Sequence, residues 1–291
     1  MAQNFCLGVE ISQDHLKIAL VEPKRRHVVK VDMVPTSGNS MNDASIYASV
    51  LSSWARNNLP PASELERNRT AAVFPSCNGI MRLVAIPKEL ESGYGDYINW
   101  EFEHATDFKA SDYNLDKFFI PNEKKPERVI VTAIERRFVE RLDRSDFSPG
   151  CLMSDIVALL NLLEESEGLG SQPKCVLKAD EKFTIAFWGS SAGFLAIRFL
   201  PKDCISAQAV IDILKSGFEE FPKAKRNVKL CGELSANEEF VAELAVAAKE
   251  LKNPIEIQPW NSISKFSLGK NVDFLKLSQC LGAIGATLSC A

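Results

Sequence analysis

The chain has 291 residues, of which 46% are hydrophobic, so it can bury at least one large core and has a length typical of about two domains. Its net charge of −4, with one short basic run at 24–26, argues against nucleic acid as a partner. No apolar run reaches the roughly 18 to 20 residues that span a bilayer, and the first residues lack a secretory signal, so we expect a cytoplasmic protein without a membrane span.

The cysteines and histidines do not indicate a metal site or a catalytic triad. The eight cysteines are scattered, with no CxxC pair, and metal ligands normally come in tightly spaced pairs. The three histidines, His15, His27 and His104, show no spacing that would support either chemistry. We expect reduced thiols that are mostly buried, no bound metal and no nucleophile.

The first predicted elements are three short strands joined by tight polar turns, at 5–11, 15–22 and 27–34, followed by a helix over 43–57. In the second strand, polar and apolar residues alternate as in a half-buried strand. Lys17 lies between two apolar residues of that strand, so the simplest interpretation of its side chain is that it faces solvent.

A different unit follows, in which one strand, one helix and two strands form a small α+β module inserted at about 74–134. Its helix has acids between its apolar residues, as an amphipathic helix does, and Trp100 has the spacing of a core aromatic. The predicted elements of this region are strands at 70–74 and 80–86, a helix at 94–106, and strands at 113–120 and 128–134.

Helices over 135–142 and 154–165, the second with Ser154 as its N-cap, complete the first half. The segment 168–173, rich in Gly, Ser and Pro, marks the boundary. We therefore expect a first subdomain at 1–170 and a second at 171–291, whose C-terminal helix returns toward the first.

The second half repeats the pattern of the first. Strands near 176–177, 183–188 and 194–200 form another meander, and a helix follows at 207–221. A three-stranded meander followed by a helix, occurring twice at a separation of about 170 residues, predicts two similar subdomains that face each other. The space between them is the expected place for a ligand.

Several short motifs accompany this duplication, in the same order along nearly the whole chain. They are Arg82, Pro87 and Trp100-Glu101-Phe102-Glu103, then Val131-Thr132-Ala133, the stretch from Gly150 to Leu159, and Gly282-Ala283-Ile284-Gly285-Ala286. Together they resemble the PilM-like type IV pilus assembly proteins of the actin-like ATPase superfamily, which includes actin, sugar kinases and FtsA. The resemblance implies an α/β protein with a duplicated actin-like (ribonuclease H-like) ATPase fold and a small α+β module inserted in the first half.

In that superfamily, two hairpin turns hold the phosphates of ATP, and glycines there let backbone N–H groups approach the phosphate oxygens. By this resemblance, Ser12 and Asp180 stand where glycines are usual, and Lys178 replaces an aspartate on the metal side. The resemblance assigns the following candidates for the ATP pocket: Glu10, Ser12, Gln13, Lys17, Lys178, Asp180, Thr184 and Gly232.

The charges at these turns disfavour a nucleotide. Two unit charges about 4 Å apart interact by roughly 4 kcal/mol at an effective dielectric constant near 20, so Asp14, Asp180 and Glu181 would repel a triphosphate. The side chains at both glycine positions also take up space. We therefore predict a degenerate nucleotide pocket with no catalytic residues and no cofactor, and ATP with Mg²⁺ is the alternative.

Three functions stay open at this stage. The first is a non-catalytic scaffold, peripheral to the inner membrane, that binds a short cytoplasmic peptide of a membrane-anchored pilus or secretion protein. The resemblance implies that this peptide lies in the groove between the inserted module and the first subdomain.

The second function is an active or slow ATPase in which Lys17 and Thr184 still hold ATP. The third is the cytoplasmic domain of a GspL-like type II secretion protein. That group continues into a membrane-spanning helix, whereas this chain ends at Ala291 without one, which favours the pilus-type function. Whether the chain self-associates stays open.

Overall fold

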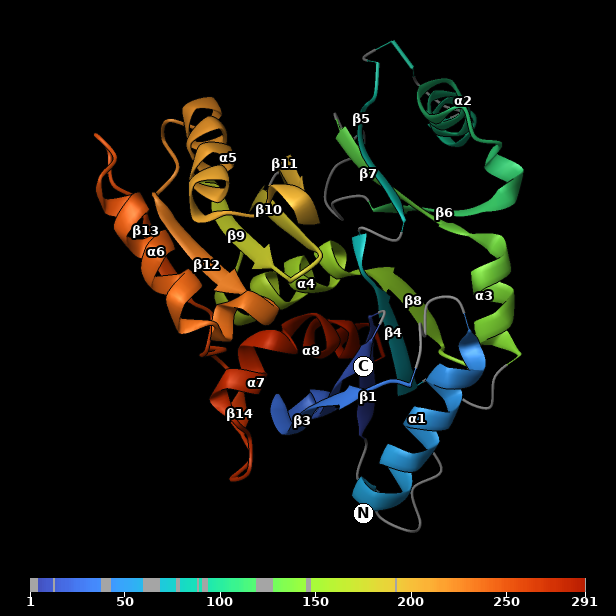
Figure 1. Ribbon diagram of the computed structural model, residues 1–291. Helices are drawn as coiled ribbons and strands as arrows, with labels where there is room; N and C mark the ends of the chain where they lie inside the picture. The colour runs from blue at the N-terminus through green and yellow to red at the C-terminus, as the bar shows by residue number, and fades with distance from the viewer. Residues whose placement is uncertain are drawn as a thin grey trace.

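Two α/β halves and a small third sheet make up the molecule (Figure 1). The computed structural model describes residues 5–12, 14–37, 43–59, 69–76, 79–87, 89–90, 94–118, 128–144, 148–191 and 193–290. Gln13 and Cys77 lie outside these described residues. Within them, no helix is long and apolar enough to cross a membrane.

The first half is built on a mixed six-stranded sheet. Its strands are β1 (Cys6–Ile11), β2 (His15–Glu22), β3 (His27–Pro35), β4 (Thr70–Phe74), β8 (Cys151–Ser154) and β14 (Ser267–Leu268). In space they follow the order β14-β3-β2-β1-β4-β8. β1, β2 and β3 form an antiparallel meander, whereas β4 and β8 continue the sheet in parallel beside β1. The sequence patterns predict the meander and β4, but not the short strands β8 and β14.

The second half contains a five-stranded sheet with the same topology. Its strands are β9 (Lys174–Ala179), β10 (Phe183–Ser190), β11 (Gly193–Pro201), β12 (Asn227–Cys231) and β13 (Glu256–Pro259). Their order is β11-β10-β9-β12-β13, with an antiparallel meander followed by β12 parallel to β9 and β13 parallel to β12. The pairing around β9 thus reproduces the pairing around β1, and the predicted duplication of an α/β unit is confirmed.

The inserted module is a three-stranded antiparallel sheet covered by one helix, as the sequence predicts. It comprises β5 (Ile80–Ala85), α2 (Tyr94–Thr106), β6 (Tyr113–Phe118) and β7 (Arg128–Glu135), with the strand order β5-β7-β6. Ile98 of α2 packs on one face of this sheet, and the ring of Phe102 lies 5.7 Å from that of Tyr113 on β6. Met81 and Leu83 belong to the other face of the sheet and pack against the core that the two halves share. Trp100 is 51% exposed, so its expected core role is wrong; its ring lies instead 4.5 Å from that of His104.

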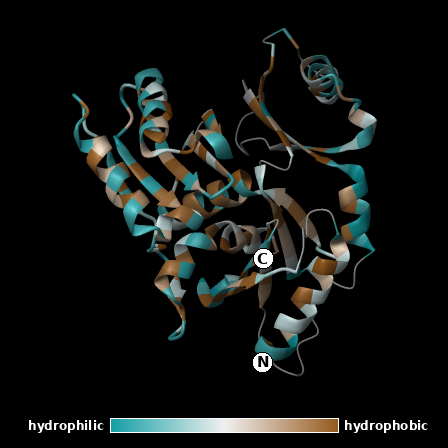
Figure 2. Cartoon of the chain, viewed as in Figure 1, coloured by the Kyte–Doolittle hydropathy of each residue, from teal (hydrophilic) through white to brown (hydrophobic). Residues whose placement is uncertain are grey.

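Several of the remaining helices begin at polar N-cap residues that the sequence supplies. Side chains of Asp43, Ser154, Ser206 and Asn237 each accept a hydrogen bond from a first-turn backbone N–H. Figure 2 shows hydrophobic residues along the central strands, whereas the outer helices carry both kinds, as amphipathic helices do. These helices are α1 (Ala44–Asn58), α3 (Arg136–Asp143), α4 (Asp155–Glu167), α5 (Ala207–Glu220), α6 (Glu238–Lys249), α7 (Phe274–Gln279) and α8 (Leu281–Thr287).

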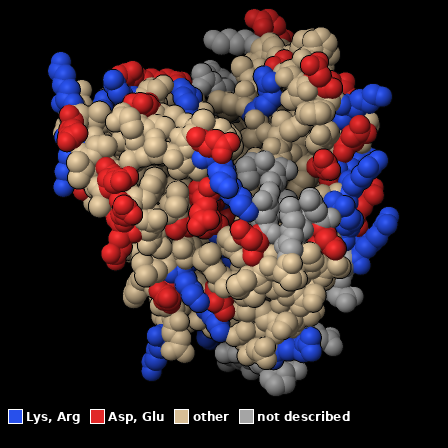
Figure 3. Space-filling view, viewed as in Figure 1, with Lys and Arg blue, Asp and Glu red and all other residues tan. Residues whose placement is uncertain are grey.

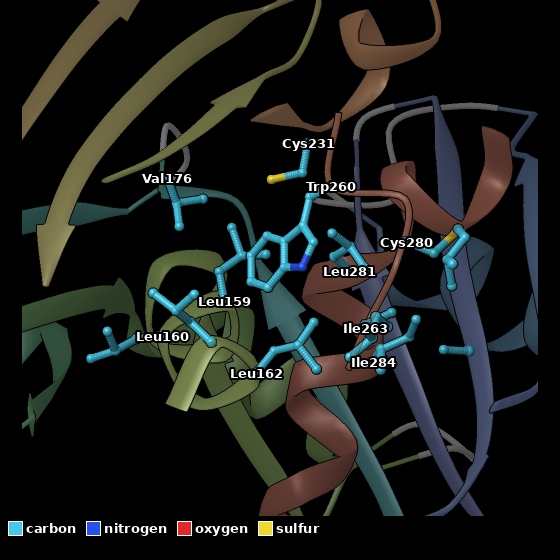
Figure 4. Close-up of a cluster of buried hydrophobic side chains, with 14 of the residues drawn as sticks. Leu159, Leu160, Leu162, Val176, Cys231, Trp260, Ile263, Cys280, Leu281 and Ile284 are labelled. Carbon is cyan, nitrogen blue, oxygen red and sulfur yellow. The ribbon is translucent and has the colours of Figure 1, made fainter. Parts of the chain in front are cut away.

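The largest core cluster is shared by both halves. Figure 4 shows Leu159, Leu160 and Leu162 of α4 around Trp260, together with Val176 of β9 and Ile284 of α8. The halves therefore join through a common apolar layer, in which the exposed fraction of Trp260 is 1%.

The C-terminal helix α8 lies against β1, β4 and α4 at very short backbone distances. A Cβ atom at Gly285 would come within 2.0 Å of the carbonyl oxygen of Ala158, and one at Gly8 within 1.8 Å of that of Ala283. Only glycine permits these approaches. The helix thereby packs on the first strand of the molecule, close to the site described next.

Candidate functional site

The turns that end the first two strands of each meander face each other where the halves meet. Most of the predicted pocket residues come together at this point, and all but Ser12 are buried there. Gln13 lies outside the described residues. The buried members are Glu10, Lys17, Lys178, Asp180, Thr184 and Gly232.

Lys17 crosses from β2 of the first half to acids of the second half. Its Nζ lies 3.0 Å from Asp180 Oδ1, 3.2 Å from Glu233 Oε1 and 3.2 Å from Glu10 Oε1. Its side chain is 1% exposed, so the expectation that it faces solvent is wrong. A carboxylate on the facing half draws the ammonium group inward, an interaction that alternation along one strand cannot reveal.

Lys178 crosses in the opposite direction, from β9 of the second half to acids of the first. Its Nζ lies 2.7 Å from Glu10 Oε1 and 2.6 Å from Asp155 Oδ2, and 3.1 Å from Asp180 Oδ2 within its own half. Its ammonium group also lies 5.0 Å from the centre of the Phe183 ring, within range of a cation–π contact. With a side chain that is 3% exposed, Lys178 is shielded from solvent.

Asp155 is a member of the site that the sequence analysis did not single out. It is the first residue of α4 and is fully buried, where its Oδ1 accepts hydrogen bonds from the backbone N–H groups of Ser76 and Ile156 and from the Ser76 hydroxyl. Its Oδ2 faces Lys178. The sequence feature that could have identified Asp155 is its position directly after the N-cap Ser154, where the helix dipole favours a carboxylate.

Glu233 and His15 close the outer side of the site. Glu233 belongs to the short 3₁₀ segment η6 (Glu233–Ala236), and its backbone N–H donates to Asp180 Oδ1 at 2.9 Å. The His15 ring lies between two acids, with Nε2 2.9 Å from Glu233 Oε1 and Nδ1 2.6 Å from Asp14 Oδ1. Neither His15 nor Glu233 is a candidate from the sequence, because the chain positions that meet here lie far apart.

Gly232 lets η6 approach the turn after β9. Its φ of +93° belongs to the region that favours glycine, and a Cβ atom there would lie 2.6 Å from the carbonyl oxygen of Ala179. The predicted residue Thr184 is buried on β10, and its hydroxyl has no hydrogen-bond partner among the described residues. The same holds for Glu10 Oε2, which faces Gly282 of α8.

The ion pairs keep Lys17, Lys178 and Asp180 charged. Burial alone would lower the pKa of Lys17, but the carboxylates of Asp180 and Glu10 raise it more, and the net pKa lies above the usual lysine value. The pKa of Lys178 is raised in the same way, with Asp155 as the main opposing charge to burial. Burial would raise the pKa of Asp180, but Lys17 and Lys178 outweigh it and hold that pKa well below its usual range.

His15 and Glu233 shift each other. Burial alone would lower the pKa of His15. The contacts with the Glu233 and Asp14 carboxylates together raise this pKa by more than burial lowers it, so the net pKa lies above the usual histidine value. Burial would raise the pKa of Glu233, but the contact with His15 and the charge of Lys17 lower it below its usual value. These shifts favour the protonated imidazole next to an ionised carboxylate.

The site is therefore an ion network in which four buried or half-buried carboxylates surround two ammonium groups, and the His15 imidazole joins one of these carboxylates, Glu233, to the exposed Asp14. This arrangement can hold the halves together, because its ion pairs cross from one half to the other. Among the residues that the structure describes, no group of His, Cys, Asp or Glu side chains is arranged to hold a metal ion. The six charged residues at its centre are Glu10, Lys17, Asp155, Lys178, Asp180 and Glu233, and we call them the ion cluster.

Comparison with known proteins places this geometry in a fold. No family profile matches the chain, and no curated protein is similar to it in sequence. Among solved structures, a chain of a PilM–PilN type IV pilus biogenesis complex is similar with a TM-score of 0.72 and 17% identity, covering 98% of both chains.

Two further structures are less similar. A protein of unknown function with an actin-like ATPase fold from Bacteroides thetaiotaomicron has a TM-score of 0.56 and 14% identity, covering 88% of this chain and 91% of that one. The cytoplasmic domain of EpsL, an inner-membrane component of the type II secretion system of Vibrio cholerae, has a TM-score of 0.52 and 10% identity, covering 97% and 94%. The fold expected from the sequence is confirmed: this chain has the actin-like ATPase fold.

Proposed function

We propose that this chain is a non-catalytic scaffold of a pilus or secretion assembly, and that its nucleotide pocket is degenerate. The observation that carries the proposal is the ion cluster. Lys17 and Lys178 are buried cations behind the facing hairpin turns, and each is already paired with three carboxylates. A triphosphate would have to displace these partners and enter beside an excess of negative charge.

The approach to the cluster is acidic as well. Asp14 and Glu181 lie on the two facing turns and are exposed. Figure 3 shows acidic side chains gathered near the middle of the face where the two halves meet. Like charges disfavour one another by several kcal/mol at short range in a partly desolvated cleft, at about 4 kcal/mol for two unit charges 4 Å apart. This repulsion between the acidic side chains and the phosphates supports the exclusion of ATP at the entrance of the pocket.

A thermal-shift experiment tests the degenerate pocket. The melting temperature is measured with no nucleotide, with about 5 mM Mg-ATP and with Mg²⁺ alone. We expect all three melting temperatures to agree, because a degenerate pocket binds no nucleotide. A nucleotide that did bind would be detected, since a ligand at 100 times its dissociation constant adds about 2.7 kcal/mol of stability. A rise of several degrees with Mg-ATP that Mg²⁺ alone does not produce would replace this proposal with the ATPase alternative.

We further propose that the scaffold binds a short cytoplasmic peptide of a membrane-anchored partner, which would hold it at the inner membrane. Two observations support this proposal: the likeness to a chain of the PilM–PilN complex, and a cavity of about 480 Å³ between the inserted module and α3. One wall carries the exposed Phe108 and the half-buried Tyr113, and the other carries Arg136 and Arg137. Aromatic side chains next to charged ones suit a peptide with apolar anchors.

A binding assay tests this groove with the cytoplasmic tails of membrane-anchored pilus and secretion proteins from the same genome. We expect one tail to bind the wild-type chain and Phe108→Ala to weaken it at least tenfold, because an aromatic anchor contributes at least about 1.4 kcal/mol to an interface. Phe274→Ala is the matched control, since Phe274 is 61% exposed on α7 and does not line the groove.

Other outcomes of the same assay discriminate between alternatives. Binding that survives Phe108→Ala but is lost in Phe199→Ala would move the site to the cavity of about 700 Å³ between β5 and β11, which Phe199 lines. Failure of every pilus and secretion tail to bind would refute the docking proposal. A tail from a type II secretion component that alone binds would favour the GspL-like function.

A further inference from the structure

Glu10 and Lys178 hold equivalent positions in the two halves. Each is the penultimate residue of the first strand of its meander, Glu10 in β1 and Lys178 in β9. Each strand pairs in antiparallel fashion with the next strand of its meander and in parallel with the strand that follows the helix, β4 or β12. The duplicated fold brings these two positions face to face, with 2.7 Å between Lys178 Nζ and Glu10 Oε1.

The charge at this meeting point decides whether the halves attract each other. With acids at both positions, these two carboxylates together with Asp155 and Asp180 would face the single ammonium group of Lys17, an excess of negative charge that a bound cation would have to neutralise. Lys178 places a cation there covalently. A lysine ammonium has three N–H donors, and Lys178 has three carboxylates within 3.1 Å, two from the first half and one from the second.

We propose that the Lys178 ammonium is a built-in substitute for a bound cation, which locks the two halves in one relative orientation without any ligand. Lys17 reinforces the lock from the opposite side, because it reaches the second-half acids Asp180 and Glu233. The inference goes beyond the scaffold proposal and does not depend on the peptide groove. A failed peptide assay would leave it intact.

Hydrogen–deuterium exchange of the full chain tests the lock in Lys178→Met, which keeps the length of the side chain and removes its charge. We expect exchange in β1 and β9 to rise at least roughly tenfold, because uncompensated buried carboxylates favour opening of the junction. The rise should be clearly smaller in the cores around α1 and α5. Lys182→Met is the control, since Lys182 also reaches the other half, at 3.1 Å from Asp14, but its side chain is 34% exposed.

The results separate a lock from a general stability effect. Wild-type exchange in β1 and β9 of Lys178→Met would overturn the proposal. So would an equal rise in every segment, because it would mean that the substitution destabilises the whole fold and does not release the junction.

A second variant tests the cation substitution itself. Lys178→Asp creates the excess of negative charge described above, with Glu10, Asp155 and Asp180 around the new carboxylate and Lys17 as the remaining ammonium group. We expect millimolar Mg²⁺ to raise the melting temperature of this variant by several degrees and to leave the wild type unchanged. Lys178→Asn is the control, because the asparagine side chain has nearly the same volume as the aspartate of Lys178→Asp but carries no charge. A Lys178→Asp variant that does not respond to Mg²⁺, or responds no more than Lys178→Asn, would contradict the substitution.

Discussion

Asp180 shows how a single acidic residue acquires a role opposite to the one its charge suggests. Considered alone at a phosphate-binding turn, a carboxylate repels the ligand. In the structure its Oδ1 accepts from Lys17 and from the backbone N–H of Glu233, and its Oδ2 faces Lys178. Both oxygens are thus engaged with positive or donor groups, and Asp180 stabilises the protein itself.

The substitution Asp180→Asn tests this role. The amide keeps the shape of the side chain but removes a charge that two buried ammonium groups share. We expect the free energy of unfolding to fall by about 3 kcal/mol, as is usual when one member of a buried ion pair is lost. Urea denaturation at pH 7 measures the change. Asp14→Asn is the control, with an expected loss below about 1 kcal/mol because Asp14 is 58% exposed. Equal losses of unfolding free energy in Asp180→Asn and Asp14→Asn would show that burial of the Asp180 ion pairs does not increase their contribution to stability.

His15 makes part of the stability dependent on pH. Its folded-state pKa is raised, since the contacts with Glu233 and Asp14 outweigh burial and the nearby Lys17. The stability that it contributes is therefore complete below its unfolded pKa of about 6.5 and is lost as the pH rises through the folded pKa.

We expect the difference in unfolding free energy between the wild type and His15→Gln to be larger at pH 6 than at pH 9. Urea denaturation of both proteins at several pH values measures this difference. A difference that stays constant, or grows with pH, would contradict an ion pair between His15 and Glu233.

At the scale of elements, α8 determines how closely the end of the chain packs on β1 and α4. Its glycines allow backbone-to-backbone contact, so the helix lies directly over Glu10 without a layer of side chains between them. A Cβ atom at Gly282 would lie 2.3 Å from Glu10 Oε2. The short segment β14 returns likewise from the second half to pair with β3 of the first. These elements connect the halves through the backbone, in addition to the ion cluster.

The substitution Gly285→Ala tests the packing of α8. Alanine favours a helix over glycine by about 1 kcal/mol, so propensity alone predicts stabilisation. The added methyl group would instead lie 2.0 Å from the carbonyl oxygen of Ala158, and we expect a net loss of about 2 kcal/mol or more. Thermal denaturation measures the effect. Gly170→Ala is the control, because nothing lies within 4 Å of a Cβ atom there. A stabilised Gly285→Ala variant would show that α8 does not pack as described.

At the scale of the whole molecule, the apolar core and the ion cluster both cross the junction of the halves. Trp260, from the second half of the chain, packs with Leu159 and Leu160 of α4, which belong to the first. Such shared burial couples the folding of the two halves, because neither can expose its side of the core without affecting the other.

We therefore expect both halves to unfold in a single transition. Single-tryptophan variants report on each half separately, with Trp54 in the core of the first half and Trp188 in the core of the second. The urea midpoints from the two probes should coincide at pH 7. Distinct midpoints would mean that the halves unfold independently, and the junction would then contribute little to stability.

The sequence by itself determined the repeated unit. Alternation of polar and apolar residues, turn residues and helix caps are local signals, and they locate the two meanders, the helices α1, α2 and α5, and the inserted module. The candidate residues Glu10, Lys17, Lys178 and Asp180 also come from the sequence, through the resemblance of its two turns to the phosphate-binding turns of actin-like ATPases. The short strands β8 and β14 do not, since so few residues carry no clear periodicity.

Only the tertiary structure decided what the charges do. Repulsion of a phosphate by Asp180 can be inferred from one turn, but its pairing with Lys17 requires the opposite half to be in place. Asp155 and Glu233 enter the site for the same reason, from segments distant in the chain. Coulombic energy depends on the distance between charges and on their exclusion from water, and neither quantity is encoded locally in the order of residues.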